Sequence, residues 1–112
     1  MKLIKAYIRI LMVDEVIHAL EKIDITRISV IDVREMGRSI DRHHFKYSME
    51  YATTYTPVVK IEMVCKDEEV DKIVKVVKEN AHTGRKGDGI IFVSPVEEAF
   101  HIRTGKKGKK FL

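Results

Sequence analysis

Apolar residues recur along this chain with two different periods, and the period changes from one segment to the next. Four short stretches are dense in aliphatic and β-branched residues, which is typical of strands. In the third of them, which Pro57 opens, Val59, Ile61, Met63 and Cys65 fall on one side. The predicted strands cover residues 2–10, 28–33, 58–66 and 89–93.

Two other stretches carry apolar residues at the i, i+3, i+4 and i+7 spacing of an amphipathic helix. They predict one helix over residues 13–23 and another from Val70 to near Ala81, with Asp67 as the N-cap of the second. The resulting order, β-α-β-β-α-β, predicts an α+β fold, a ferredoxin-like sandwich with both helices on one face of the sheet. In a chain of 112 residues, another subunit is the natural cover for the opposite face.

One connection is far too long for the hairpin that this order requires. Gly37–Thr56, with the sequence GRSIDRHHFKYSMEYATTYT, joins the second and third predicted strands, where a hairpin takes about two to five residues. The residues alone leave two interpretations open: a flexible insertion, or an extended arm that docks on a partner.

Charge and composition argue against a nucleic-acid-binding protein and against a membrane-spanning one. The net charge is only +4, because 17 acidic residues offset 21 basic ones, and this is not the bulk composition of a nucleic-acid binder. Much of the basic excess lies in the tail, residues 105–112. Cys65, the single cysteine, cannot form an intrachain disulfide and is predicted to be a small buried filler. No apolar run approaches the ~20 residues of a membrane span, so we expect a cytoplasmic protein without membrane insertion.

The stretch HTGRKGDGIIFVSP, residues 82–95, sets three glycines and two cations directly before the fourth predicted strand. Glycines allow left-handed backbone conformations, so that N–H groups can point into one concavity that suits phosphate oxygens. Arg85 and Lys86 add positive potential to such a nest. A helix C-cap and connector explains the same residues, and the loop is not a Walker motif, because no GK[ST] follows. Both interpretations remain open from these residues alone.

Over residues 83–105, TGRKGDGIIFVSPVEEAFHIRTG, the chain resembles the C-terminal signature of the nitrogen-regulatory P-II signal proteins. Gly37-Arg38, which opens the long loop, and the VVKIE that follows Pro57 extend the resemblance. The resemblance implies one P-II-like domain over residues 1–112, assembled as a compact homotrimer with a projecting T-loop, residues 37–56. Such proteins are sensors and not enzymes. They bind ATP or ADP, and often 2-oxoglutarate, in the clefts between subunits and report to transporters, regulators or metabolic enzymes through the T-loop.

The resemblance also implies which residues bind the nucleotide. The positions that line the phosphates and ribose correspond to Gly87, Asp88 and Gly89. Val64 matches a position near the adenine, and Ser29 matches one near the nucleotide. Two arginines match positions that pair with phosphates, whose geometry suits the guanidinium fork. The full set comprises Ser29, Arg38, Val64, Gly87, Asp88, Gly89, Ile90, His101, Ile102 and Arg103.

Four positions depart from the family pattern, all of them in the anion-binding part of the site. Ser39 stands where a glutamine is expected, Val58 and Ile90 stand where lysines are expected, and His101 stands where an arginine is expected. Each lost charge-assisted contact costs roughly 1.5–3 kcal/mol. We therefore expect weak or absent 2-oxoglutarate binding and a preference shifted toward ADP or AMP, and the role of Mg²⁺ is left open.

The long loop holds further candidates. Tyr51 matches the position at which many relatives carry a tyrosine that is uridylylated or adenylylated. His43 and His44 are weak candidates for a metal site, because no further ligand at a suitable spacing supports them.

Competing interpretations are a divergent relative tied to metal or bicarbonate transport, a small ferredoxin-like enzyme, and a ferredoxin-like RNA-binding module. No Ser/His/Asp set, Cys/His pair or acid pair supports an enzyme. The aromatic strand motifs on which RNA-binding modules stack bases are missing.

Overall fold

A computed structural model describes residues 1–35 and 56–108 of the chain. Along this part, helices and strands follow the predicted β-α-β-β-α-β order, with two short 3₁₀ turns added. None of the described helices is long and apolar enough to cross a membrane. The elements are β1 (Lys2–Arg9), η1 (Ile10–Met12), α1 (Val13–Glu21), β2 (Ser29–Glu35), β3 (Thr56–Cys65), η3 (Asp67–Glu69), α3 (Val70–Ala81) and β4 (Gly89–Pro95).

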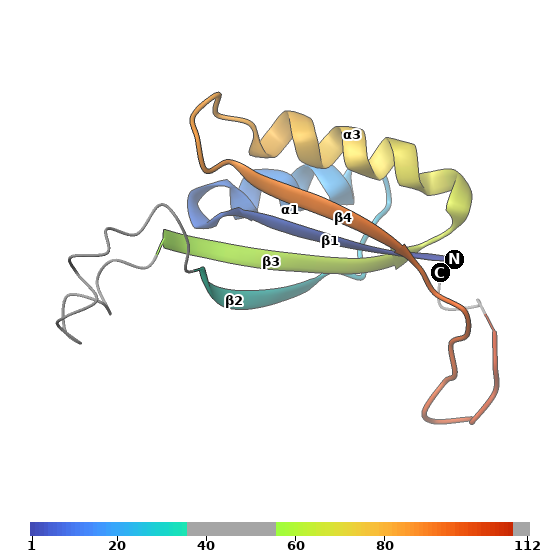
Figure 1. Ribbon diagram of the computed structural model, residues 1–112. Helices are drawn as coiled ribbons and strands as arrows, with labels where there is room; N and C mark the ends of the chain where they lie inside the picture. Colours follow the sequence, from blue (N-terminus) through green and yellow to red (C-terminus); the bar gives the residue numbers. More distant parts are fainter. Residues whose placement is uncertain (36–55, 109–112) are drawn as a thin grey trace, which may run out of the picture.

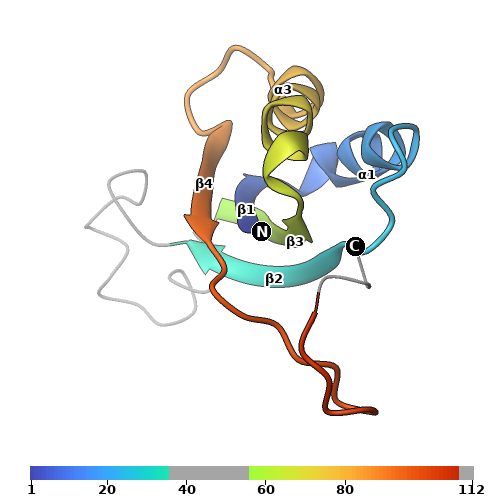
Figure 2. The same ribbon diagram turned by 90° about the vertical axis from the view of Figure 1, so that its right-hand side faces the viewer.

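The four strands form one antiparallel sheet in the order β2-β3-β1-β4, so the first strand of the chain is central and the last lies at an edge. Ile4 of β1 pairs with Met63 of β3 on one side and with Val93 of β4 on the other. Both helices cover the same face of this sheet (Figure 1, Figure 2). The predicted ferredoxin-like fold is confirmed.

The hydrophobic core lies between that face and the two helices. β1 contributes Ile4, Ala6 and Ile8, which are at most 2% exposed and alternate with residues on the opposite face. Cys65 is 1% exposed in the same cluster, which confirms it as a buried filler, and burial raises the pKa of its thiol. The apolar stripes of the helices complete the cluster with Val16, Leu20, Ile73, Val77 and Ala81.

The start of the second helix differs from the prediction. Asp67 is not its N-cap, because η3 comes first and α3 begins at Val70, after Glu69, whose side chain makes no cap hydrogen bond. The carboxylate of Asp67 instead accepts a hydrogen bond from the N-terminal amine of Met1 at 2.6 Å. The start of β1 pairs with the end of β3, which brings this amine to the connection, and an ammonium group is a stronger partner than a neutral helix N–H.

Beyond β4 the chain leaves the sheet and turns back on itself. Phe100 and Lys107 form an antiparallel bridge, and the N–H of Gly108 donates to the carbonyl of Ala99 at 3.1 Å. These contacts close a hairpin-like C-terminal arm, residues 99–108, which projects away from the side of the molecule that carries the helices (Figure 1, Figure 2).

Candidate functional site

The connection between α3 and β4, residues 82–89 and here called the glycine loop, takes its shape from its glycines. After Ala81 the chain is extended at His82, with φ −70° and ψ 128°. Gly84 and Gly87 then adopt φ of +85° and +100°, a region that other residues rarely enter. The left-handed conformations expected from the sequence are therefore present, and they let the loop fold back toward the sheet.

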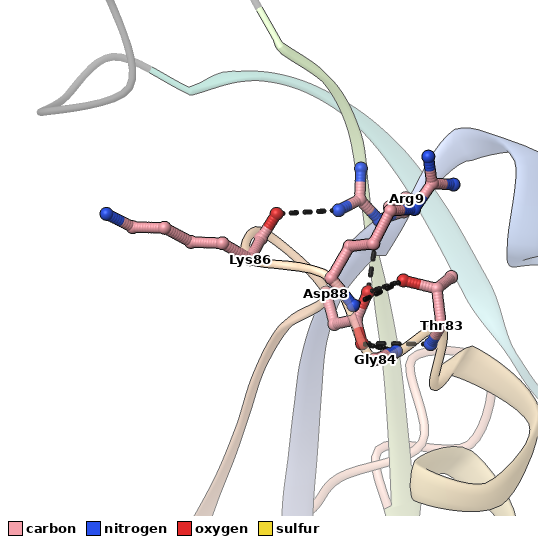
Figure 3. A network of polar contacts seen from close by, with 6 residues as sticks. Arg9, Thr83, Gly84, Lys86 and Asp88 are labelled. Carbon is pink, nitrogen blue, oxygen red and sulfur yellow. Dashed lines mark hydrogen bonds and ion pairs between the residues drawn. The ribbon is translucent and has the colours of Figure 1, made fainter.

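The carboxylate of Asp88 joins the start of the glycine loop to its end (Figure 3). One of its oxygens accepts hydrogen bonds from the backbone N–H groups of Thr83 at 2.9 Å and Gly84 at 3.0 Å, and the other accepts one from the Thr83 hydroxyl. These donors favour the ionised form, the Thr83 hydroxyl most of all, and they hold the pKa of Asp88 well below its usual range.

Arg9, at the end of β1, ties the glycine loop to the sheet. Its Nε donates to Oδ1 of Asp88 at 3.2 Å, and its Nη2 donates to the carbonyl of Lys86 at 2.7 Å (Figure 3). Sequence reasoning missed both Arg9 and Thr83 as partners of Asp88. For Arg9 no local signal could have revealed the contact, because the partners are 79 positions apart. For Thr83 the signal was its place at the start of a tight turn, five positions before an aspartate.

The structure brings together one group of the predicted site residues: Gly87, Asp88, Gly89 and Ile90. Ile90 pairs with Tyr7 and is 54% exposed, on the sheet face opposite the helices. An apolar side chain therefore lies at the position for which the resemblance predicts a lysine.

A pocket of about 440 Å³ lies beside this group, between α3 and the start of β4. Apolar side chains such as Ile8, Val77 and Ala81 form most of its wall, and Lys78 and His82 also line it. Residues of α3 and of the core face of β1 line it, and Tyr7 and Ile90 line it at the edge formed by β4.

A second group of predicted site residues, Ser29 and Val64, lines a pocket of about 190 Å³ at the other end of the sheet. The strand register gives the separation of the two groups. Gly89 pairs with Ile8, whereas Val64 pairs with Leu3, five residues earlier on the same strand. At ~3.3 Å per residue the two groups lie about 16 Å apart along β1.

A third group, His101, Ile102 and Arg103, belongs to the C-terminal arm. The backbone N–H of His101 donates to the carbonyl of Lys106 at 2.9 Å, and Ile102 is fully exposed. The arm and the glycine loop lie on opposite sides of the molecule in both views (Figure 1, Figure 2). Within one chain, the three groups of predicted site residues do not converge.

The remaining candidates, Arg38, Ser39, His43, His44 and Tyr51, lie outside the described residues. Within residues 1–35 and 56–108, no group of three or more His, Cys, Asp or Glu side chains could hold a metal ion. The roles predicted for the long loop therefore stay predictions.

Comparisons with known proteins agree over nearly all of the chain. The family model "Nitrogen regulatory protein P-II" matches residues 1–106. The nitrogen regulatory protein P-II of Azospirillum brasilense is 43% identical over 108 residues, which is 96% of each chain. The P-II protein of Rhodobacter capsulatus is 41% identical over 109 residues, 97% of each chain. The crystal structure of Arabidopsis thaliana PII bound to citrate matches with a TM-score of 0.76 and 33% identity, over 97% of this chain and 86% of that one. The chain belongs to the P-II family of nitrogen regulatory proteins.

Proposed function

We propose that this protein is a homotrimeric signal protein that binds adenine nucleotides in the clefts between subunits and regulates a partner through the loop at residues 37–56. The proteins of its family are regulatory signal proteins and not enzymes. In this proposal the protein forms one domain over residues 1–112 and acts in the cytoplasm. Its partner is a transporter, enzyme or regulator of nitrogen metabolism.

The separation of the site residues carries this proposal. One chain holds the glycine loop at one end of the sheet and Ser29 with Val64 about 16 Å away at the other end. A cleft between two chains would receive the glycine loop from one and Ser29 with Val64 from its neighbour. The C-terminal arm, which carries Arg103, supports the same arrangement, because it projects from the side of the molecule opposite the glycine loop (Figure 1, Figure 2). Three such clefts close a ring of three identical subunits.

The glycine loop supplies phosphate-binding chemistry. Gly84 and Gly87 adopt the left-handed conformations from which anion-binding nests are built, and Arg85 with Lys86 contributes positive charge. In Figure 3 the side chain of Lys86 points away from the Asp88 carboxylate, so it does not take part in the internal network of the loop.

The departures from the family pattern favour ligands of lower charge. Ile90 offers no charge to a terminal phosphate, so we propose that ADP or AMP competes better against ATP here than in relatives with a lysine. The Arabidopsis relative was solved with citrate, a small polycarboxylate. In this chain Val58 is 5% exposed and uncharged, and we propose that anions such as citrate or 2-oxoglutarate bind weakly for that reason.

Mixed trimers test whether the site is shared between chains. Ser29→Trp blocks one half of the proposed site, and Ile90→Asp sets a negative charge against the other half. Both positions are exposed, so neither change disturbs the core. Each pure variant should bind ADP at least about tenfold more weakly than the unmodified protein, as measured by calorimetry.

Trimers that contain both variants, refolded together, should regain sites with unmodified affinity, because some clefts then combine two intact halves. If each chain carried a complete site, no mixture would regain binding, and the shared-site proposal would be wrong. Sedimentation velocity on the same samples reports whether the assembly is a trimer.

A further inference from the structure

We infer that Arg9 is a positioning residue for the glycine loop: it holds the loop against the end of β1 and neutralises the Asp88 carboxylate, so that the loop can accept an anion. The inference rests on the proposed function only where it takes that anion to be a nucleotide phosphate.

Arg9 contacts three consecutive residues of the loop. Nη2 donates to the carbonyl of Lys86 at 2.7 Å, and Nε donates to Asp88 at 3.2 Å. Between them, a Cβ built on Gly87 would lie 3.2 Å from Nη2, so the guanidinium packs directly against this glycine. A planar fork can make these contacts at once, whereas the single ammonium of a lysine cannot.

The base of this support is rigid. Arg9 ends the central strand and pairs with Val58 of β3, and the residue before it, Ile8, is 2% exposed in the core. A strand that is hydrogen-bonded to neighbours on both sides moves little, so a side chain on it can hold a loop in place better than a side chain on another loop. Arg9 thereby fixes the position of the glycine loop relative to the sheet.

Arg9 also balances the charge of Asp88. An ionised carboxylate beside the loop amides would repel an approaching phosphate, whereas a guanidinium at 3.2 Å cancels most of its field at longer range. Both side chains are 24% exposed, so water screens this pair only in part. Without Arg9, the loop would present a negative charge next to Gly87.

Three variants separate the roles of Arg9. Arg9→Met keeps an unbranched apolar stem and removes the guanidinium with its charge and donors. Arg9→Lys keeps the charge and loses the fork. Lys22→Met, which removes an exposed cation just after α1, is the matched control.

Hydrogen exchange in the nucleotide-free protein gives the first readout. In Arg9→Met we expect the amides of Thr83 and Gly84, which donate to Asp88, to exchange about tenfold faster or more. The core amides of Ile4 and Ile61 should keep their rates, which shows that the fold is intact. Arg9→Lys should lie between Arg9→Met and the unmodified protein, and Lys22→Met should change nothing.

Carbon-13 NMR of the Asp88 carboxyl group gives a second readout, which reports the charge beside that carboxylate as well as its hydrogen bonds to Thr83 and Gly84. Arg9→Met should raise the pKa of Asp88, because a hydrogen-bonded cation that favours the carboxylate is lost, whereas Arg9→Lys should leave it nearer to the unmodified value. Unchanged exchange at Thr83 and Gly84 in Arg9→Met would overturn the inference, as would an unchanged Asp88 titration.

Calorimetry with ADP then links the positioning to binding. We expect Arg9→Met to weaken ADP binding about tenfold and Lys22→Met to leave it unaltered. If the unmodified protein binds none of ATP, ADP and AMP, the proposed function is wrong, and exchange with titration still decides what Arg9 does for the loop. If ADP binds Arg9→Met as tightly as the unmodified protein, the positioning role is wrong even though the proposed function stands.

Discussion

Gly89 lies directly against the backbone of Tyr7. A Cβ on Gly89 would come within 1.7 Å of the Tyr7 carbonyl oxygen, and Gly89 itself adopts φ +114°. The two residues belong to paired strands, in which Ile8 is the register partner of Gly89. Only glycine fits between the end of the glycine loop and β1, so this residue allows β4 to join the sheet without displacing the central strand.

The first prediction compares two glycines that share a left-handed conformation and differ in their surroundings. We expect Gly89→Ala to lower the free energy of unfolding by about 2–4 kcal/mol, because a backbone clash adds to the conformational strain. Gly105→Ala is the control: Gly105 has φ +70° with nothing within 4 Å of a built Cβ, so its cost should be about 1–2 kcal/mol. Urea unfolding measures both, and equal losses would show that the Tyr7 contact does not matter.

A second prediction tests the core beneath the sheet. Leu20 of α1 is 0% exposed, whereas Leu11 of the η1 turn is 87% exposed. Leu20→Ala should therefore cost about 2–5 kcal/mol, and Leu11→Ala should change stability by less than about 0.5 kcal/mol. Chemical unfolding of the two variants gives the comparison, and a small effect at Leu20 would contradict its burial in the core.

The sequence predicted those features of the fold that depend on local spacing. The alternation in β3 and the helical stripe from Val70 both became core faces, because burial selects apolar residues at the period of each element. The N-cap at Asp67 was wrong because its partner, the amine of Met1, is 66 positions away. The support of the glycine loop by Arg9 escaped notice for the same reason.

The sequence predicted which residues belong to the candidate site but not how they are arranged in the fold. The glycines and their left-handed conformations follow from residue type alone. The division of the set between the two ends of the sheet depends on strand order and register, which residue spacing does not reveal. Ser29 and Val64, however, do line one pocket together.

A third prediction concerns pH. The pKa of Asp88 lies below its usual range in the folded protein, so the stability that this group contributes is present above the unfolded pKa of about 4 and is lost as the pH falls below it. Asp88→Asn lacks this contribution. The difference in stability between the unmodified protein and Asp88→Asn should therefore be largest near pH 7 and shrink below about pH 4.

Thr83→Val tests the cause of the lowered pKa of Asp88, because the hydrogen bond from the Thr83 hydroxyl lowers that pKa more than any other contact does. The variant should raise that pKa, as followed by carbon-13 NMR of the carboxyl group. Arg85→Met, at an exposed position of the same loop, is a suitable control, since the Arg85 side chain is absent from the interactions that shift Asp88. A stability difference that stays constant from pH 7 to pH 3 would contradict the role assigned to Asp88.

The last prediction addresses nucleotide preference and rests on the proposed function. Ile90 is 54% exposed beside the glycine loop, so Ile90→Lys adds a charge without disturbing the core. If the phosphates of a bound nucleotide lie there, one new charge-assisted contact of roughly 1.5–3 kcal/mol should raise ATP affinity about tenfold or more relative to AMP. Phe92→Lys is the matched control, because Phe92 lies two residues further along the same strand face and is 51% exposed. Calorimetry with ATP, ADP and AMP on both variants gives the ratios. Equal gains for the two lysines would mean that general electrostatic attraction, and not a phosphate position at residue 90, causes the effect.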